Sequence, residues 1–129
     1  MRVYKANELH VSAPDQIGLL AKVSVRCRDA GIDIIGVTAY RRDNLAWFVL
    51  HTTNPVKAAE VLADMNVIWQ EVLVLECEPG IGALAKIAER ISAAGINILY
   101  CYGSVGNGDM TRLFVDTTHN DRALEALSR

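Results

Sequence analysis

A glycine-rich turn at residues 79–83 has the residue types best suited to hold a small anion. Gly80, Ile81 and Gly82 follow an apolar run and open a helical pattern, and with Ala85 they satisfy the spacing G-x-G-x-x-A. This spacing is the fingerprint of dinucleotide-binding loops, in which the backbone approaches a pyrophosphate. The turn therefore binds either a dinucleotide or something smaller.

The residues after the turn argue against a dinucleotide. Such a site needs a carboxylate about 20 positions further on, at the end of the next strand, to bind the ribose hydroxyls. The segment 99–104 reads LYCYGS and has no carboxylate. What remains is a helix N-terminus with free N–H groups that attract an anion, and a glycine that lets a ligand approach the backbone. The alternative is that the glycines only permit a tight turn or close packing.

The chain contains an internal repeat. Residues 15–34 align without gaps to residues 79–98, and ten of the twenty positions are identical. Further on, residues 45–62 align to residues 110–127, with one extra residue between the two aligned blocks. A repeat of this length indicates a tandem duplication of one structural unit.

Each repeat predicts the order strand, helix, strand, strand, helix. Gly31 and Gly95 stand where helix C-termini favour a left-handed residue, and Asn54-Pro55 predicts the start of another helix. The expected strands are 8–13, 32–40, 45–52 and 66–70 in the first repeat, and 71–76, 96–104 and 111–118 in the second. The expected apolar helix stripes are Leu20, Val23, Cys27, Ala30 and Leu84, Ile87, Ile91, Ala94. The expected hairpin turns are 42–44 and 106–109, and the last helix is expected to begin near Asn120 or Asp121.

A hairpin between two helices predicts an α+β fold of ferredoxin-like (βαββαβ) type with antiparallel sheets, not a doubly wound nucleotide-binding sheet. The second repeat lacks a counterpart of strand 66–70. Residues 1–6 precede the first repeat as residues 65–70 precede the second, and Met1 and Val3 match Met65 and Val67. The N-terminal segment is thus expected to supply the fourth strand of the second repeat; the alternative is a frayed tail.

Composition limits the classes of partner. The net charge is −2 and the basic residues are scattered, which does not indicate a nucleic-acid-binding surface. No apolar run approaches the roughly 18–20 residues needed to cross a membrane, and residues 1–10 lack the apolar region of a signal peptide. The three cysteines are widely spaced and read as the reduced thiols of a cytoplasmic protein.

The sequence shows no catalytic or metal-binding pattern. His10, His51 and His119 are far apart, and Asp15 and Asp116 are single carboxylates without a paired acid. Metal sites and general acid–base pairs require several such groups at one place. We expect no catalytic residue, no metal and no cofactor.

The repeated motifs resemble the ACT domain, a small regulatory module of amino-acid metabolism. The resemblance rests on DQIGLL and PGIGAL at the strand-to-helix turns, and on AGIDI and AGINI after the helices. Because both repeats match, it covers nearly the whole chain, as modules 7–70 and 71–129. The arrangement is similar to stand-alone bacterial proteins made of two ACT modules in tandem, with the helices of each module on one face of its sheet.

The resemblance implies that a free amino acid binds at an interface between ACT modules. In this family the ligand contacts the strand-to-helix loop of one module and the start of the second strand of its neighbour. Carried over to this sequence, the loop residues are Asp15, Gln16, Ile17 and Gly18, and Pro79, Gly80, Ile81, Gly82 and Ala83. The strand position is Asn97, followed by Ile98.

The two repeats differ at the strand position. The Asn97 amide both accepts and donates hydrogen bonds, as binding of an ammonium and a carboxylate requires, whereas Asp33 in the first repeat repels a carboxylate. A site that uses Asn97 is therefore favoured, and Asp33 is equally well explained as a solvated turn residue. Tyr100 and Tyr102 alternate on one strand and share a face. They either wall a pocket or are ordinary half-buried strand aromatics.

The resulting functional prediction is a cytoplasmic, non-catalytic regulatory protein. It binds an amino acid, forms a dimer and acts on a partner enzyme in trans, because two modules fill the chain. The alternative is a structural module that assembles without a ligand. A small ferredoxin-like enzyme is a third, weaker possibility, because the sequence offers no titratable pair for it.

Overall fold

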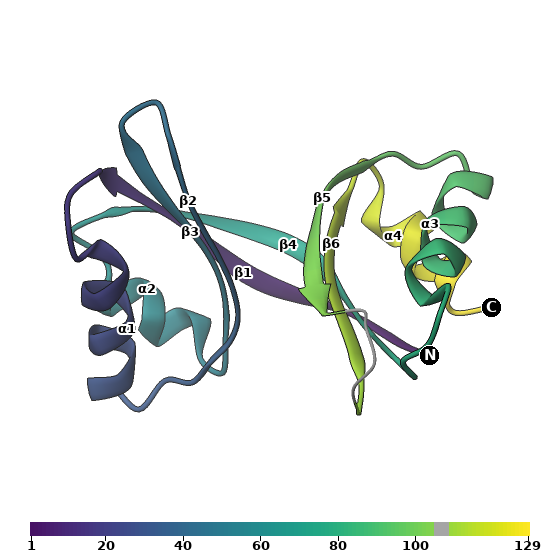
Figure 1. Ribbon diagram of the computed structural model, residues 1–129, viewed down its shortest axis with the longest axis horizontal. Helices are drawn as coiled ribbons and strands as arrows, with labels where there is room; N and C mark the ends of the chain where they lie inside the picture. Colours follow the sequence, from purple (N-terminus) through teal and green to yellow (C-terminus); the bar gives the residue numbers. More distant parts are fainter. Residues whose placement is uncertain (105–108) are drawn as a thin grey trace. The chain divides into compact units, whose positions relative to one another are not determined.

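The alternation of strands and helices predicted from the repeats is present in the structure. In a computed structural model that describes residues 1–104 and 109–129, six strands and four helices are found (Figure 1). The strands are β1 (Arg2–Pro14), β2 (Ile34–Arg42), β3 (Leu45–Thr52), β4 (Asn66–Cys77), β5 (Ile98–Ser104) and β6 (Thr111–Thr117). The helices are α1 (Leu19–Asp29), α2 (Pro55–Val61), α3 (Ala83–Ala93) and α4 (Asn120–Leu127).

The strands follow the order β2-β3-β1-β4-β6-β5, and the pairs β1–β3, β2–β3, β4–β6 and β5–β6 are antiparallel. The expected α+β class with antiparallel strands is confirmed. Strands β1 and β4 are longer than the sequence predicted. Each of them joins two segments that had been assigned to separate strands, 1–6 with 8–13 and 66–70 with 71–76.

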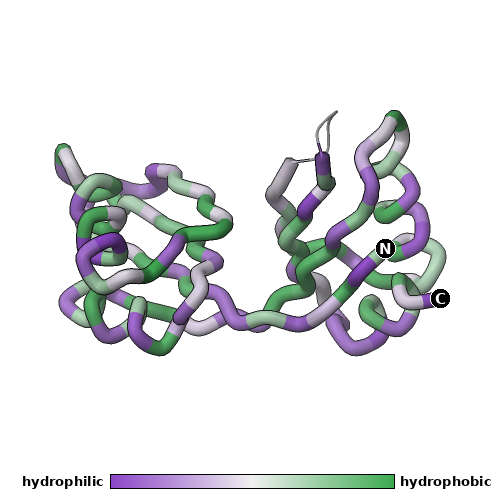
Figure 2. The backbone as a smooth tube through the Cα atoms, turned by 90° about the horizontal axis from the view of Figure 1, so that it is seen from below, coloured by the Kyte–Doolittle hydropathy of each residue, from purple (hydrophilic) through white to green (hydrophobic). Residues whose placement is uncertain are grey.

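The chain divides into two compact units. The first unit is Asn7–Gln70, and the second unit combines Met1–Ala6 with Glu71–Arg129. Strands β1 and β4 contribute residues to both. Green hydrophobic and purple hydrophilic stretches alternate along the chain in each unit (Figure 2).

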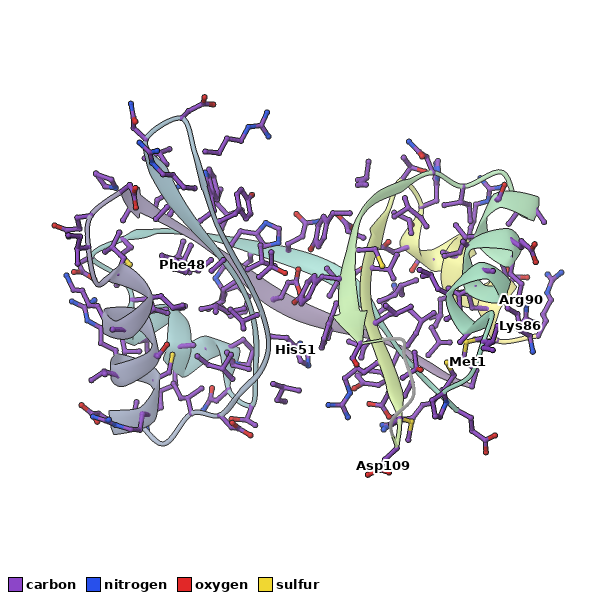
Figure 3. All side chains as sticks on the ribbon, viewed as in Figure 1. Met1, Phe48, His51, Lys86, Arg90 and Asp109 are labelled. Carbon is purple, nitrogen blue, oxygen red and sulfur yellow. The ribbon has the colours of Figure 1, made fainter. Side chains whose placement is uncertain are left out.

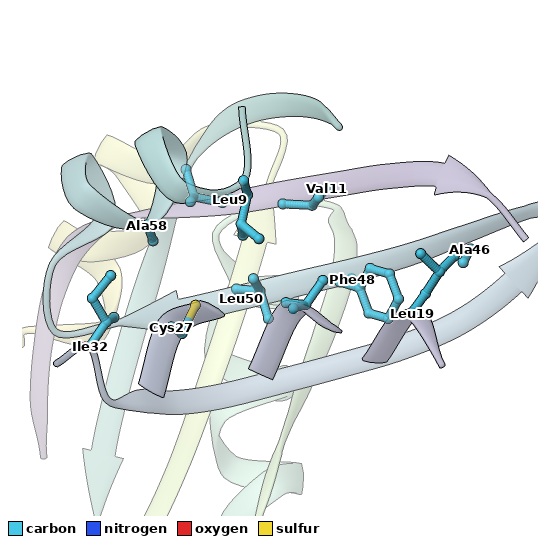
Figure 4. Packing of buried hydrophobic residues seen from close by; sticks show 11 residues of the cluster. Leu9, Val11, Leu19, Cys27, Ile32, Ala46, Phe48, Leu50 and Ala58 are labelled. Atoms are coloured by element: carbon cyan, nitrogen blue, oxygen red, sulfur yellow. The ribbon is translucent and has the colours of Figure 1, made fainter. Parts of the chain in front are cut away.

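The core of the first unit lies between its strands and the helices α1 and α2. On β1, Leu9 and Val11 are fully buried, and on β3 the residues Phe48 and Leu50 are almost fully buried (Figure 4). Alternate residues of a strand point to one face, so this spacing of two turns one face of the strands toward the helices. The helices contribute Leu19, Val23, Cys27, Ala58 and Leu62.

The second unit repeats this packing. Alternate residues of β4 and β6 are buried against α3 and α4. The cluster comprises Leu73, Leu75, Ile87, Ile91, Ile96, Leu113, Val115, Ala123 and Leu127. Two separate cores of this kind are what a duplicated sequence requires, because each copy carries its own apolar face.

The apolar stripe predicted for the helices is wrong at its first position. Leu20 and Leu84 are about half exposed, and in the first unit the core residue is instead Leu19. Helix α1 begins at Leu19, directly after Gly18, so the inward face runs through residues 19, 23 and 27. Residue 20 is rotated about 100° from residue 19 and therefore faces outward.

The predicted turn at 42–44 and the predicted start of α2 are both present in the structure. Asp43 and Asn44 have φ values of 53° and 63°, as a two-residue turn between antiparallel strands requires. The Asn54 side chain accepts a hydrogen bond from the Lys57 N–H at 3.1 Å and caps α2. The turn expected at 106–109 falls largely on residues 105–108, outside the described part of the chain.

The N-terminal segment makes specific contacts within the second unit. Val3 packs against the core of this unit. The Tyr4 hydroxyl donates to Glu76 Oε1 at 3.0 Å, and Arg2 Nη1 lies 3.5 Å from Glu76 Oε2. Lys5 forms an ion pair with Asp121 on α4. These contacts come from both sides of β1 and hold it beside β4.

Deletion of residues 1–6 is expected to destabilise the second unit. It removes the partly buried Val3 side chain and leaves Glu76 without its tyrosine donor, a loss of about 2–4 kcal/mol in the free energy of unfolding. Denaturant unfolding followed by circular dichroism measures this loss, and Val3→Ala should show a smaller part of it. An unchanged unfolding midpoint after the deletion would show that the segment contributes no strand.

Candidate functional site

The two glycine turns have the same backbone geometry. Gly18 precedes α1 with φ 90° and ψ 7°, and Gly82 precedes α3 with φ 86° and ψ 3°. Residues with a Cβ rarely adopt these angles, so glycine is required at both positions. Neither helix has a side-chain cap at this end or an acidic residue in its first turn. Both N-termini therefore keep N–H groups that attract an anion.

An isoleucine precedes each of these glycines and is fully exposed. The relative solvent-accessible area is 105% for Ile17 and 107% for Ile81, so both side chains extend fully into solvent. Single exposed apolar residues are common on protein surfaces. Here the same exposure occurs at the same place in both repeats, next to a helix N-terminus. The position offers an apolar contact to a ligand side chain or to another protein.

The turn of residues 15–18 is tied to the β2–β3 hairpin. The Asp15 N–H donates to the Asn44 carbonyl at 2.9 Å, and Arg41 Nε lies 2.8 Å from Asp15 Oδ2. The same arginine donates through Nη2 to Asn44 Oδ1 at 2.9 Å. Pro79 occupies the matching position in the other turn and has neither an N–H nor a carboxylate. The two turns thus share a backbone shape but differ in their anchoring.

Asp33 and Asn97 have equivalent backbone contacts and exposed side chains. The Asp33 N–H donates to Thr53 Oγ1 at 3.0 Å, and the Asn97 N–H donates to Thr118 Oγ1 at 3.2 Å. In return, the threonine N–H groups donate to the carbonyls of Asp33 and Asn97. The side chains remain available to a ligand. Ile98 packs against the core of the second unit, so only its backbone is accessible to a ligand.

Within one unit, the structure does not bring the glycine turn and the strand position together. Gly82 lies at the N-terminal end of α3, and Asn97 follows its C-terminal end. A helix of 11 residues is about 16 Å long. One small amino acid cannot span that distance, so a site that uses both residues requires two modules.

Tyr100 and Tyr102 lie on one face of β5, as their spacing predicted. Their rings are stacked with centroids 6.4 Å apart, and Tyr102 also stacks on Phe114 of β6 at 4.8 Å. Both tyrosines are half-buried and Phe114 is buried. The three rings form a continuous aromatic surface on β5 and β6.

A charged cluster beside α1 was not predicted. Arg26 forms a two-pronged pair with Asp64, and the longer of its two hydrogen bonds, Nη2 to Oδ2, is 3.0 Å. Lys22 Nζ lies 3.8 Å from the same carboxylate. The hydrogen bond from Arg26 lowers the pKa of Asp64, and the same bond raises the pKa of Arg26. The available signal was the identity of Lys22 and Arg26 with Lys86 and Arg90 in the second repeat.

In the described part of the chain, surface hollows adjoin several candidate residues. Asp15 and Gln16 line one of about 370 Å³ in the first unit. Ala83 lines another, of about 310 Å³, in the second unit. Asp33 lines a third, of about 430 Å³, at the C-terminal end of α1. All three are large enough for a small metabolite.

Among residues 1–104 and 109–129, no group of three or more histidine, cysteine or acidic side chains is placed to hold a metal ion. In the same residues, no helix has the length and apolar character needed to cross a membrane.

Comparison with known proteins identifies the fold. No protein-family model and no curated protein sequence matches the chain. A crystal structure of a Bacteroides thetaiotaomicron protein has 23% identity and a TM-score of 0.89, over 98% of this chain and 88% of that one. The regulatory subunit of aspartate kinase from Thermus thermophilus has 17% identity and a TM-score of 0.66, over 98% and 94% of the two chains. The corresponding subunit from Thermus flavus has 19% identity and a TM-score of 0.63, with the same coverage.

These similarities are consistent with the α+β, ferredoxin-like fold predicted from the motifs. The chain is similar in fold to regulatory subunits of aspartate kinase. At these identities the similarity concerns the fold alone.

The charged cluster predicts a specific pH dependence of stability. The hydrogen bond from Arg26 holds the folded-state pKa of Asp64 below its usual value. Its ionised form therefore stabilises the protein above the unfolded-state pKa of about 3.9, and this contribution is lost as the pH falls through the folded pKa. Asp64→Asn should lower the melting temperature at pH 7, and the difference from wild type should shrink below about pH 4.

Melting curves between pH 3 and pH 7 measure this effect. Glu60→Gln is the control, because Glu60 is an exposed carboxylate on the neighbouring helix α2. A difference that is constant across the pH range would contradict a stabilising role for the ionised Asp64.

Proposed function

We propose that the protein is a non-catalytic regulatory protein of the stand-alone tandem ACT type. It binds a free amino acid and acts on a partner enzyme in trans, in the cytoplasm. A glycine turn of one copy binds the ligand carboxylate. The Asn97 amide of a second copy accepts from the ligand ammonium and donates to the ligand carboxylate, so the protein works as a dimer.

The observation that carries this proposal is the pair of uncapped helix N-termini behind Gly18 and Gly82. An amino acid presents a carboxylate, which the free N–H groups and the partial positive charge of a helix N-terminus favour. Exposed Ile17 and Ile81 lie beside these groups and provide apolar contact for the ligand side chain. The exposed Asn97 amide both accepts from an ammonium and donates to a carboxylate.

The similarity to regulatory subunits of aspartate kinase supports the regulatory part of the proposal. A regulatory protein of this kind acts by changing the activity of another protein. We infer that the partner is an enzyme of amino-acid metabolism and that the ligand is an amino acid related to its pathway. Regulation then requires that the ligand bind the two states of the complex with different affinities.

A second candidate function is assembly without a ligand. The exposed Ile17 and Ile81, together with exposed Val37 on β2 and Leu99 on β5, favour this alternative. Strands β2 and β5 are the two ends of the strand order, and unpaired strand edges with apolar residues pair readily with another chain. Both functions predict self-association, and only the first predicts a ligand.

A thermal-shift screen with the twenty amino acids separates these functions. A ligand at about 100 times its Kd stabilises the native state by about 2.7 kcal/mol, which raises the melting temperature by several degrees. We expect one amino acid, or a few related ones, to produce this shift at millimolar concentration. The absence of a shift with all twenty would favour the assembly function.

Asn97→Asp is expected to weaken binding of the amino acid found in that screen. The substitution puts a negative charge near the ligand carboxylate, which should raise the Kd at least about fivefold. Calorimetry measures the Kd. Asp33→Asn is the matched control at the equivalent position of the first repeat, and it should leave the Kd unchanged. Equal affinity of Asn97→Asp and wild type would remove Asn97 from the site.

A further inference from the structure

A cluster of two arginines and a glutamate lies on the side of the second unit's strands that faces away from α3 and α4. Arg2 of β1, Glu76 of β4 and Arg112 of β6 stand in a row, because β4 lies between the other two strands and Glu76 is paired with Arg112. Val3 and Leu75 are their neighbours along the strands and pack in the core. The cluster is therefore on the opposite side of the strands from the helix N-terminus that the proposed function uses.

Glu76 holds both arginines. Its Oε2 atom lies 3.5 Å from Arg2 Nη1, and its Oε1 atom lies 3.3 Å from Arg112 Nη2. The Tyr4 hydroxyl donates to Oε1 at 3.0 Å, and the Arg2 guanidinium lies over the Tyr4 ring, 4.6 Å from its centroid. The Glu76 side chain is only 12% exposed. Its carboxylate is thus engaged by three donors and fixes the positions of two guanidinium groups.

This cluster has one cation in excess. Among residues 1–104 and 109–129, neither arginine lies within ion-pair distance of a carboxylate other than that of Glu76. Asp109 lies beside the start of β6, and its side chain points away from the strands (Figure 3). One negative charge therefore offsets two positive ones.

Most of the hydrogen-bond donors of the two arginines are not used by Glu76. A guanidinium carries five N–H groups on three nitrogens, and each arginine directs only one nitrogen at the carboxylate. The Nε atom of Arg112 is buried and has no acceptor among the residues that the structure describes. A buried donor of this kind is destabilising unless a water molecule, an ion or a ligand supplies the acceptor.

The fold does not require these charges. In the first unit the equivalent positions hold Ser12, Trp47 and Asn66. Ser12 is paired with Trp47, and the Asn66 amide donates to Ser12 Oγ at 3.2 Å. The same arrangement of strands thus forms with neutral side chains, so the sheet itself gives no reason for the two arginines.

We propose that Arg2 and Arg112 bind a phosphoryl group, at a second ligand site of the protein. The Arg112 Nε–H and the unused N–H groups of Arg2 donate to the phosphoryl oxygens, and Glu76 positions the two guanidinium groups. The ligand is inorganic phosphate or a phosphate monoester. This site goes beyond the proposed function, because it includes no residue of the glycine turns and does not include Asn97.

A phosphoryl group suits the two arginines better than a carboxylate does. The arginines come from the strands on either side of β4. A carboxylate has two oxygens in one plane and is satisfied by a single guanidinium. A phosphate monoester has three terminal oxygens and a charge of about −1.5 to −2 at pH 7, so it can accept from both guanidinium groups at once. Acetate should therefore bind more weakly than phosphate.

Nitrogen-15 amide NMR titration of the full chain at pH 7 tests the site. The probes are sodium phosphate, adenosine 5′-monophosphate and sodium acetate, at constant ionic strength so that screening does not cause the shifts. We expect phosphate to move the signals of residues 2–4, 76 and 112 with a Kd of about 1 mM or lower, and acetate to bind at least about tenfold more weakly. Tighter binding of the nucleotide would identify a phosphate monoester as the ligand, and weaker binding would identify free phosphate.

Arg112→Met and Arg2→Met should each weaken phosphate binding at least about fivefold, because each removes charge-assisted hydrogen bonds. Arg112→Lys keeps the charge opposite Glu76 and should still weaken binding, since lysine has no Nε–H and no planar fork. Arg129→Met is the control for loss of one positive charge. Arg129 is exposed in the same unit and pairs with Glu125, so its replacement should change the affinity less than about twofold. Amide spectra verify that each variant remains folded.

Phosphate binding that is unchanged in both Arg112→Met and Arg2→Met, or that is lost in Arg129→Met instead, would overturn the inference. The absence of any saturable shift at up to about 20 mM phosphate would also overturn it, and would show that the cluster only stabilises the second unit. These outcomes are independent of the thermal-shift screen with amino acids, so the inference and the proposed function can fail separately.

Discussion

The burial of alternate strand residues beneath two helices is the constraint on which the rest of each unit depends. In the first unit Leu9 and Val11 of β1 lie on the same side as Phe48 and Leu50 of β3. A slip of one residue would move every one of these side chains to the opposite face, so the pairing register is fixed by the core. The fixed register also determines where β1 ends. The turn that follows it is thereby placed at the N-terminus of α1, with Gly18 as its last residue.

The order of elements could be predicted from the sequence because its signals are local and occur twice. Glycine after a helix, Asn54-Pro55 before one, and a two-residue turn all depend on a few neighbouring residues. The length of β1 and β4 could not be predicted from the repeat, because the boundaries of aligned copies do not mark the end of a strand. No glycine or proline separates residues 1–6 from 8–13, so nothing interrupts β1. The apolar stripe was predicted to begin at Leu20 and not at Leu19. The two residues are equally apolar, and only the position of the helix start determines which of them faces the core.

In the candidate site, too, local features could be predicted from the sequence and long-range contacts could not. The left-handed glycines were predictable because their conformation follows from the strand-to-helix turn itself. The pair of Arg26 and Asp64 was not, because 38 positions separate its members and no local rule connects them. A weaker signal was present. Lys22 and Arg26 are repeated as Lys86 and Arg90 on the outward side of a helix, where core packing imposes no choice of residue.

The two repeats retain the residues that the backbone needs and differ in the charges around them. Gly18 and Gly82 keep the same left-handed geometry, which no other residue type adopts as readily. By contrast, the carboxylate of Asp15 is replaced by Pro79, which also removes a backbone donor. Electrostatic recognition of a zwitterion depends on the number and sign of nearby charges, whereas the fold depends on shape and burial. A duplicated fold with different charges therefore provides two similar scaffolds that differ around the same turn, where Asp15 pairs with Arg41 in the first unit and Pro79 carries no charge in the second.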